Sequence, residues 1–239
     1  MVYGRSGGWL LNGINMARDK FIRYQQVKRL ENVRDLGHLR PGTMANERGN
    51  WGRQVFGNEN PIILELACGK GEYAIALAKK YPDKNFIGID IKGERIWKGA
   101  GRALDENLPN VFFLRSRIDF LDQIFSENEI SGIWITFPDP YLKSSKESKR
   151  LTSSKFLNLY KNILKPGAHV NLKTDSDELY AFTQKSVQEY GATVQEQIDD
   201  VYSLPEVPEL LQIRTYYETK HLQKGLTIHF ISFTLTQDS

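Results

Sequence analysis

Short apolar runs alternate with amphipathic helical patterns along most of this chain. The apolar runs predict buried strands at 62–65, 86–89, 110–114, 130–137 and 169–173. Apolar residues at helical spacing predict helices at 93–106, 152–164 and 177–190, and one more after the first run, with Tyr73, Ile75, Leu77 and Ala78 on its apolar face. Two late strands are expected at 193–198 and 226–235.

This order of elements predicts an α/β fold of the Rossmann-like type. Strands separated by helices form parallel sheets, so we expect a mostly parallel, seven-stranded sheet with helices on both faces. The last two strands lack the regular helix between them, and the last one is therefore expected to be antiparallel.

The N-terminal part is distinguished by its charge. Residues 17–36 show a helical pattern that Pro41-Gly42 ends. Residues 1–40 carry eight Lys or Arg and three acids, whereas the whole chain has a net charge of only +3. We expect a basic, partly flexible extension at 1–40 and a single domain at 41–239. A basic extension favours a polyanionic partner, nucleic acid before membrane, although a solvated helix face would have the same composition.

Composition narrows the class of protein further. The chain has 239 residues, of which 40% are apolar, and no apolar run approaches membrane-spanning length. Its one cysteine, Cys68, cannot form an internal disulfide, and its four histidines show no metal-ligand spacing. These features predict a cytoplasmic protein with neither a membrane segment nor a metal.

The stretch 62–90 contains a candidate ligand site. A strand ends at Glu65, a turn with Gly69 and Gly71 follows, and the next strand ends at Asp90. Strand, glycine turn, helix, strand and acid is the pattern of a nucleotide-binding βαβ unit, in which the acid accepts the ribose hydroxyls. An ordinary crossover with a tight turn is the alternative.

Acids recur at the ends of the other predicted strands. Ligands of open α/β sheets bind beyond the carboxyl ends of the strands, where Glu65, Asp90, Asp139 and Asp175 would gather. Pyrophosphate prefers backbone amides and positive charge, so this rim suits a cation that carries a ribose. S-adenosylmethionine fits that description.

Five motifs in order make the chain similar to a known family. They are CGKGEY at 68–73, FIGID at 86–90, FPDPYLK at 137–143, KTD at 173–175 and TYYE at 215–218. With these motifs, residues 51–233 resemble the bacterial tRNA (guanine-N7-)-methyltransferases, a class I, S-adenosylmethionine-dependent family. The Phe-Pro-Asp-Pro-aromatic stretch is the most specific part of the match.

The resemblance implies roles for individual residues. The cofactor-binding residues would be Glu65, Gly69, Gly71, Asp90, Arg117 and Asp139. The residues that meet the RNA substrate would be Lys143, Lys149, Arg150, Asp175, Thr215, Tyr216, Tyr217 and Glu218, with Lys146 in the same loop as Lys149. Arg117 stands where the family usually has an acid, and Tyr141 stands where it usually has Trp.

The implied reaction gives Asp139 a specific task. Guanine N7 has a free lone pair and no proton, so its methylation needs no general base at that atom. A fixed carboxylate can instead offset the charge that the base gains. The implied substrate is tRNA, at position 46 of the variable loop, acted on by a monomer or homodimer. An amino-methyltransferase on adenine or protein, and an RNA-binding relative that has lost catalysis, are the alternatives.

Overall fold

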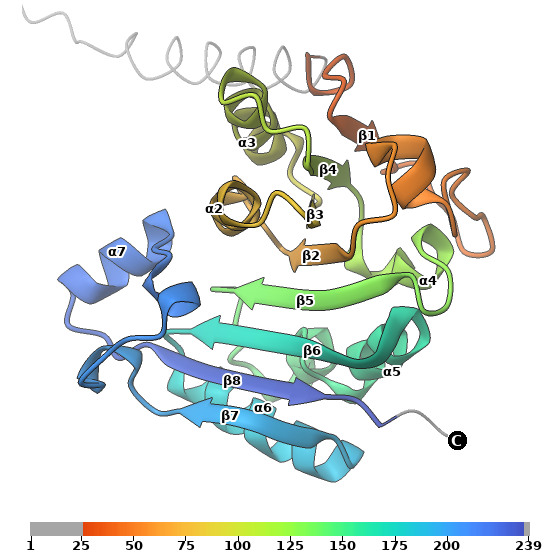
Figure 1. Cartoon of the computed structure of the whole chain (residues 1–239). Coiled ribbons are helices and arrows are strands. Elements are labelled where there is room, and N and C mark those ends of the chain that lie inside the picture. Colours follow the sequence, from red (N-terminus) through yellow and green to blue (C-terminus); the bar gives the residue numbers. More distant parts are fainter. Residues whose placement is uncertain (1–25, 237–239) are drawn as a thin grey trace, which may run out of the picture.

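The computed structural model describes residues 26–236, which form one mixed sheet between two layers of helices. The strand order is β1-β4-β3-β2-β5-β6-β8-β7, from the top to the bottom of Figure 1. The strands are β1 (Val33–Asp35), β2 (Ile62–Leu66), β3 (Asn85–Asp90), β4 (Val111–Arg115), β5 (Ile130–Thr136), β6 (Leu164–Thr174), β7 (Thr193–Ile198) and β8 (His229–Thr234). β8 runs antiparallel to both of its neighbours, β6 and β7, which confirms the predicted last strand.

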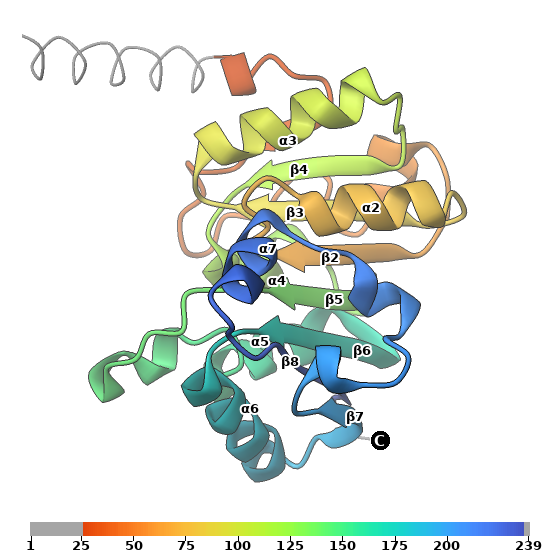
Figure 2. The same ribbon diagram turned by 90° about the vertical axis from the view of Figure 1, so that its left-hand side faces the viewer.

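The helices cover both faces, as the alternation predicted. They are α2 (Glu72–Lys80), α3 (Gly93–Asp105), α4 (Leu121–Ile124), α5 (Ser154–Ile163), α6 (Asp177–Tyr190) and α7 (Tyr216–Gln223). A π-helical turn at Gly52–Phe56 and 3-10 turns at Ile118–Phe120, Ser144–Lys149, Val201–Ser203 and Glu209–Gln212 complete the regular structure. Figure 2 shows α2, α3 and α7 together in front of the strands.

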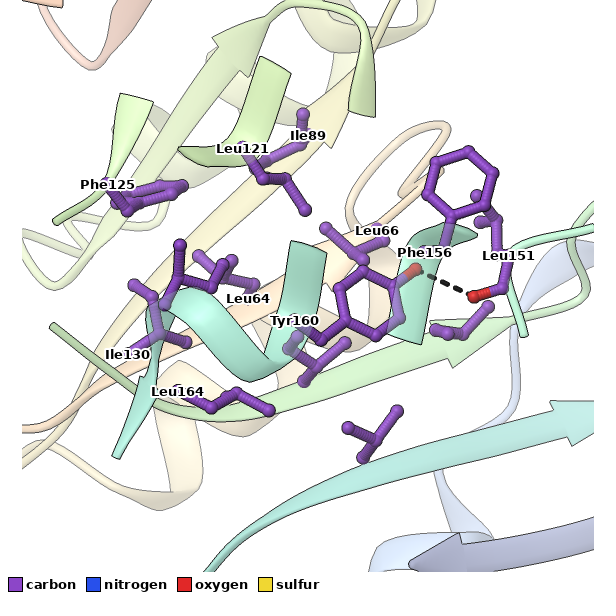
Figure 3. Packing of buried hydrophobic residues seen from close by; sticks show 14 of the residues in the cluster. Leu64, Leu66, Ile89, Leu121, Phe125, Ile130, Leu151, Phe156, Tyr160 and Leu164 are labelled. Atoms are coloured by element: carbon purple, nitrogen blue, oxygen red, sulfur yellow. Dashed lines mark hydrogen bonds between the residues drawn. The ribbon is translucent and has the colours of Figure 1, made fainter. Parts of the chain in front are cut away.

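The two faces bury separate cores because side chains alternate along each strand. Leu64 and Leu66 of β2 pack with α4, α5 and α6, whereas the side chain of Ile63 packs with α2 and α3. In Figure 3 the Tyr160 hydroxyl of α5 donates to the carbonyl of Leu151 at 2.8 Å, so the polar end of this buried ring is satisfied.

The structure corrects the expected strand count and the expected N-terminal helix. Val33–Asp35 pairs parallel with β4 as an eighth, edge strand, so the predicted helix over 17–36 is wrong there. The Asp35 carboxylate lies 2.8 Å from the Arg115 guanidinium, and the amide of Leu36 donates to the carbonyl of Arg115. These contacts hold the segment in register on the β4 edge. Residues 17–25 of the predicted helix lie outside the described residues.

Candidate functional site

Two adjoining cavities lie at the carboxyl ends of the central parallel strands. The larger one, of about 460 Å³, is lined by Asp90, Arg117 and Asp139 among others. The smaller one, of about 190 Å³, contains Glu65 and Gly69 in its wall. Ala67 borders both cavities. Glu65 and Asp139, which are 74 positions apart in the sequence, therefore lie at the same edge of the sheet, as the parallel topology requires.

The backbone around these cavities is strained. Ala67, Phe137 and Tyr141 have φ values of 54°, 50° and 44°, in the left-handed region that non-glycine residues seldom adopt. Ala67 follows β2, and the other two flank the Pro138-Asp139-Pro140 turn after β5. Strained backbone persists where the surrounding structure fixes it, and it concentrates at functional sites.

Glu65 is buried beneath the glycine turn. One carboxylate oxygen accepts a hydrogen bond from the Ala74 amide in the first turn of α2 at 2.8 Å, and the other accepts from the Thr136 hydroxyl at 3.2 Å. Burial raises the pKa of Glu65 to about 8, against the lowering effect of these two hydrogen bonds. This carboxyl fixes the start of α2 and gives the smaller cavity an ionisable wall.

Asp90 fixes the other side of the same turn. Its carboxylate accepts the Gly69 amide at 2.9 Å and the Lys92 amide at 2.8 Å. Each oxygen keeps a second lone pair that can accept a hydroxyl proton at the cavity wall. Gly71 lines neither cavity. It has φ of +63°, and a Cβ there would lie 2.3 Å from the Phe113 ring, so this glycine allows α2 to pack closely on β4.

Arg117 borders the larger cavity through an ion-pair cluster. Its guanidinium lies 3.3 Å from the Asp119 carboxylate, which also pairs with the ammonium of Lys155 from α5. Burial would raise the pKa of Asp119, but the Lys155 hydrogen bond and the charges of Lys155 and Arg117 lower it overall. The carboxylate nearest to position 117 in the sequence is thus that of Asp119, two residues later. Lys155 also lines the cavity, and no sequence motif indicated it.

Asp139 lies in a braced turn. Its carboxylate accepts the Tyr141 amide at 3.1 Å. Arg150 donates to the carbonyls of Pro140 at 3.1 Å and Tyr141 at 3.2 Å, and its guanidinium lies 4.4 Å from the centroid of the Phe182 ring. Arg150 is thus buried and turned inward, not outward toward a substrate.

The loop before Arg150 is exposed, whereas Arg150 itself is buried. Lys143, Lys146 and Lys149 are all exposed, and Figure 2 shows this segment, in green, projecting from the body. Lys149 also lines the larger cavity, while Lys143 lies outside both cavities.

The TYYE motif forms the beginning of α7. Thr215 is its N-cap and forms a reciprocal capping box with Glu218. Glu218 is fully buried, at 2.5 Å from the equally buried ammonium of Lys173, and it also accepts the Tyr202 hydroxyl at 2.7 Å. Thr215 contributes to the wall of the smaller cavity, but Glu218 does not. The geometry therefore favours an anchoring role for Glu218 over direct contact with a substrate.

Tyr216 and Tyr217 are the exposed part of this motif and line the smaller cavity. Asp175 lies outside both cavities, 3.0 Å from the His221 ring. His221 in turn contacts the Phe137 ring edge-on at 5.8 Å between centroids. No sequence motif indicated His221, because its contact with Asp175 joins the end of β6 to α7, which are far apart along the chain.

Residues 26–236 contain neither a cluster of metal-ligating side chains nor a helix that could cross a membrane. In that range no three or more His, Cys, Asp or Glu side chains gather as metal ligands would. Among the same residues, every helix is too short or too polar to cross a bilayer.

Comparisons with known proteins agree on one family. Residues 59–231 match the model of a family described as putative methyltransferases. A tRNA (guanine-N(7)-)-methyltransferase of Porphyromonas gingivalis is 52% identical over 189 residues, covering 79% of this chain and 77% of that protein. A protein of the same name from Christiangramia forsetii is 42% identical over 226 residues, covering 92% of this chain and 99% of its own.

A solved structure agrees with the fold. The 16S rRNA methyltransferase KamB superposes with a TM-score of 0.59 at 13% identity, over 84% of this chain and 98% of that one. The family match and the two relatives together settle membership: the chain belongs to the tRNA (guanine-N(7)-)-methyltransferase family.

Proposed function

We propose that this protein transfers the methyl group of S-adenosylmethionine to N7 of a guanine in tRNA, at position 46 of the variable loop. The observation that carries the proposal is the meeting of Asp90, the Gly69 turn and Asp139 around adjoining cavities at the sheet edge. Relatives that carry this activity in their name cover most of the chain.

The cavities suit the proposed cofactor in chemistry and in size. The larger volume falls in the range of about 300–1,000 Å³ that small-molecule sites occupy. Asp90 would accept the ribose hydroxyls, and the segment at Arg117 would border the adenine. The Gly69 turn and Glu65 would hold the amino-acid half, whose ammonium would lower the raised pKa of Glu65 and pair with the carboxylate so formed. The cofactor would supply an electrophilic methyl group on a positively charged sulfur.

Asp139 would act by electrostatics and orientation. As the N7–methyl bond forms and the sulfur–methyl bond breaks, the guanine becomes cationic while the sulfur becomes neutral. A carboxylate already fixed by the Tyr141 amide needs little reorganisation to offset that charge, and it can accept from the guanine amino edge. Holding both reactants in line would account for much of the acceleration.

The residues that the family resemblance places at the RNA substrate fall into two groups, those that contact the RNA and those that support the site. We assign contact with the target nucleotide or its surroundings to Lys143, Lys149, Asp175, Tyr216 and Tyr217. Three other residues that the family resemblance places there are assigned to support, because each is buried and bonded to the protein: Arg150, Thr215 and Glu218. The target base would leave its stack to reach a recessed methyl group.

A methyl-transfer assay tests the proposal. Bulk tRNA lacking 7-methylguanosine is incubated with the protein and S-adenosylmethionine, then digested and analysed by mass spectrometry. We expect 7-methylguanosine as the product. Methylated adenine or methylated protein would refute the proposal in favour of an amino-methyltransferase, and no product together with no S-adenosylhomocysteine binding would favour an RNA-binding protein.

Asp139→Asn tests the residue assignment. We expect it to lower turnover by about 100-fold or more, with S-adenosylhomocysteine binding largely unchanged in calorimetry. Asp83→Asn, an exposed acid in the turn that precedes β3, is the matched control and should retain full turnover. Unchanged turnover of Asp139→Asn would overturn the role given to that carboxylate.

We place this reaction in the cytoplasm and in a monomer or homodimer. A buried free thiol at Cys68 and a tRNA substrate support that location. Light scattering of the purified protein at several concentrations distinguishes the two assembly states.

A further inference from the structure

A cluster of cations and tyrosines borders the smaller cavity. We call it the α7 rim: Lys70 of the glycine turn, Arg95 of α3, and Tyr216, Tyr217 and Lys220 of α7. All but Lys220 line the smaller cavity. Three separate segments of the chain therefore place positive charge and aromatic rings on one exposed surface beside the site.

The cations of the α7 rim are arranged around the rings. The ammonium groups of Lys70 and Lys220 lie 4.6 and 4.5 Å from the centroid of the Tyr216 ring. The Arg95 guanidinium lies 5.9 Å from the centroid of Tyr217 and donates to its hydroxyl at 3.2 Å. The two rings meet edge-on at 5.6 Å. This is an alternation of positive groups and π-faces, not a solvated run of lysines.

The rim is fixed in place yet open to solvent. The Glu72 carboxylate accepts the Tyr216 amide at 2.8 Å, and the buried Glu218 anchors the same helix from below. Tyr216 and Tyr217 nevertheless keep 45% and 43% of their surface exposed. The hydrogen bond from Lys220 and the charges of Lys220 and Lys70 also lower the pKa of Tyr216, which indicates a positive local potential.

We propose that the α7 rim binds unpaired RNA next to the target nucleotide, with Lys70, Arg95 and Lys220 on phosphates and the tyrosines stacked on bases. Surfaces that combine cations with exposed aromatic rings bind single-stranded nucleic acid in this way, because phosphates need charge and every base has a π-face. The inference rests on the proposed tRNA substrate and adds Lys70, Arg95 and Lys220, none of which the family resemblance assigned to RNA.

The position of the rim gives it a distinct task. Lys149, at the end of the exposed Ser144–Lys149 segment, lines the larger cavity, whereas the α7 rim borders the smaller one. In Figure 2 the green segment projects from the body, away from α7, which lies in front of the strands. RNA held at both places would straddle Asp139, so that the flanking backbone is fixed while the target base enters between the two contacts.

Charge reversal tests the proposal. Arg95→Glu/Lys220→Glu is compared with Lys165→Glu, an exposed cation at the start of β6 and thus at the opposite edge of the sheet. Filter binding of tRNA over a salt series gives the affinity and its salt dependence. We expect the double variant to bind tRNA at least about tenfold more weakly and to reduce the slope of log K against log salt by about 1 for each lost phosphate contact. The control should match wild type.

Other results would overturn the proposal. Equal affinity and slope for the double variant and the control would show that these cations do not contact RNA. A raised KM for S-adenosylmethionine with unchanged tRNA affinity would assign them to the carboxylate of the cofactor instead. Thermal unfolding of each variant is followed by circular dichroism, and these exposed substitutions should leave the midpoint at the wild-type value.

The aromatic part is tested separately. Tyr217→Leu should weaken binding of an unpaired oligoribonucleotide, whereas Tyr217→Phe, which keeps the ring, should not. Equal loss in both variants would exclude stacking. These experiments measure RNA binding and not methyl transfer. They therefore test the RNA contacts of the α7 rim even if the methyl-transfer assay gives another product.

Discussion

Replacing Lys173 by Met would leave Glu218 as a buried carboxylate without its cation. Both side chains are 0% exposed in the native structure, and the ammonium lies 2.5 Å from the carboxylate. The ammonium also donates to the carbonyls of Leu211 at 2.6 Å and Ile213 at 3.2 Å, which satisfies all three of its protons. Burial lowers the pKa of Lys173, whereas the Glu218 charge acts to raise it. The pair thus fastens α7 and the segment before it to β6.

The stability that each variant loses depends on which buried groups are left without a partner. Removing one partner of a buried pair costs about 3–5 kcal/mol, because an uncompensated charge remains. We expect this loss for Lys173→Met and for Glu218→Leu. The double variant has no buried charge. It removes the native partner of two carbonyls and of the Thr215 amide and leaves the Tyr202 hydroxyl with Arg214 alone, so we expect a loss of about 2–4 kcal/mol. The coupling energy should therefore be at least about 2 kcal/mol.

Urea unfolding followed by tryptophan fluorescence measures all four members of this cycle. The matched control is the cycle of Lys185→Met and Glu189→Leu on α6, an ion pair of 3.7 Å whose side chains are 73% and 65% exposed. Its coupling should stay near 0.3–0.5 kcal/mol, roughly the value of a surface helix pair. A coupling below about 1 kcal/mol in the buried cycle would refute the reasoning, since the two charges would then be solvated independently in the native state.

Three further predictions concern single positions around the cavities. Burial raises the pKa of Glu65 from 4.5 to about 8, so between these pH values the native state binds a proton that the unfolded state does not, and stability should fall as pH rises. Glu65→Gln should make the urea unfolding midpoint less dependent on pH across that range. Gly71→Ala should destabilise by about 2–4 kcal/mol, because φ is positive and the new Cβ meets the Phe113 ring. At Gly69 φ is also positive, but a new Cβ would meet only the Arg95 Cδ at 4.0 Å, so Gly69→Ala should cost only about 1 kcal/mol in thermal unfolding. Arg150→Ala should lower turnover while tRNA affinity in filter binding stays within about threefold, because its guanidinium donates to the Pro140 and Tyr141 carbonyls of the turn that carries Asp139. A loss of affinity alone would contradict this.

The sequence predicted β2 to β8, including β7, which is exposed along most of its length. β2 to β6 read as continuous apolar runs because helices cover them on each side, and their order along the chain then determines which ends meet. β1 was missed for the opposite reason. It has three residues, too few for an alternating signal, and the spacing of Val27, Leu30 and Val33 is that of a helix. Its position depends on a free β4 edge, which no local pattern encodes.

The acids of the site were predictable because topology alone brings strand ends together. Their partners were not. Lys173 and Glu218 are 45 positions apart and meet only because α7 folds back over the end of β6. Lys155 reaches Asp119 from a helix that begins 35 residues later. From the motif, Glu218 was expected at the substrate. The packing gives that carboxylate an internal cation instead, and leaves the adjacent tyrosines as the surface part of the motif.

The loop after the Pro-Asp-Pro turn shows why charge pattern cannot assign a role by itself. Lys146, Lys149 and Arg150 are close in sequence, and each would suit an RNA-binding loop. The chain turns at Ser144–Lys149 and returns to the body at Arg150, so the last cation faces inward while the others face solvent. There it holds two carbonyls of a turn whose Tyr141 has positive φ. A strained turn needs such a brace, and an arginine with several donors and a stacking plane is suited to provide it.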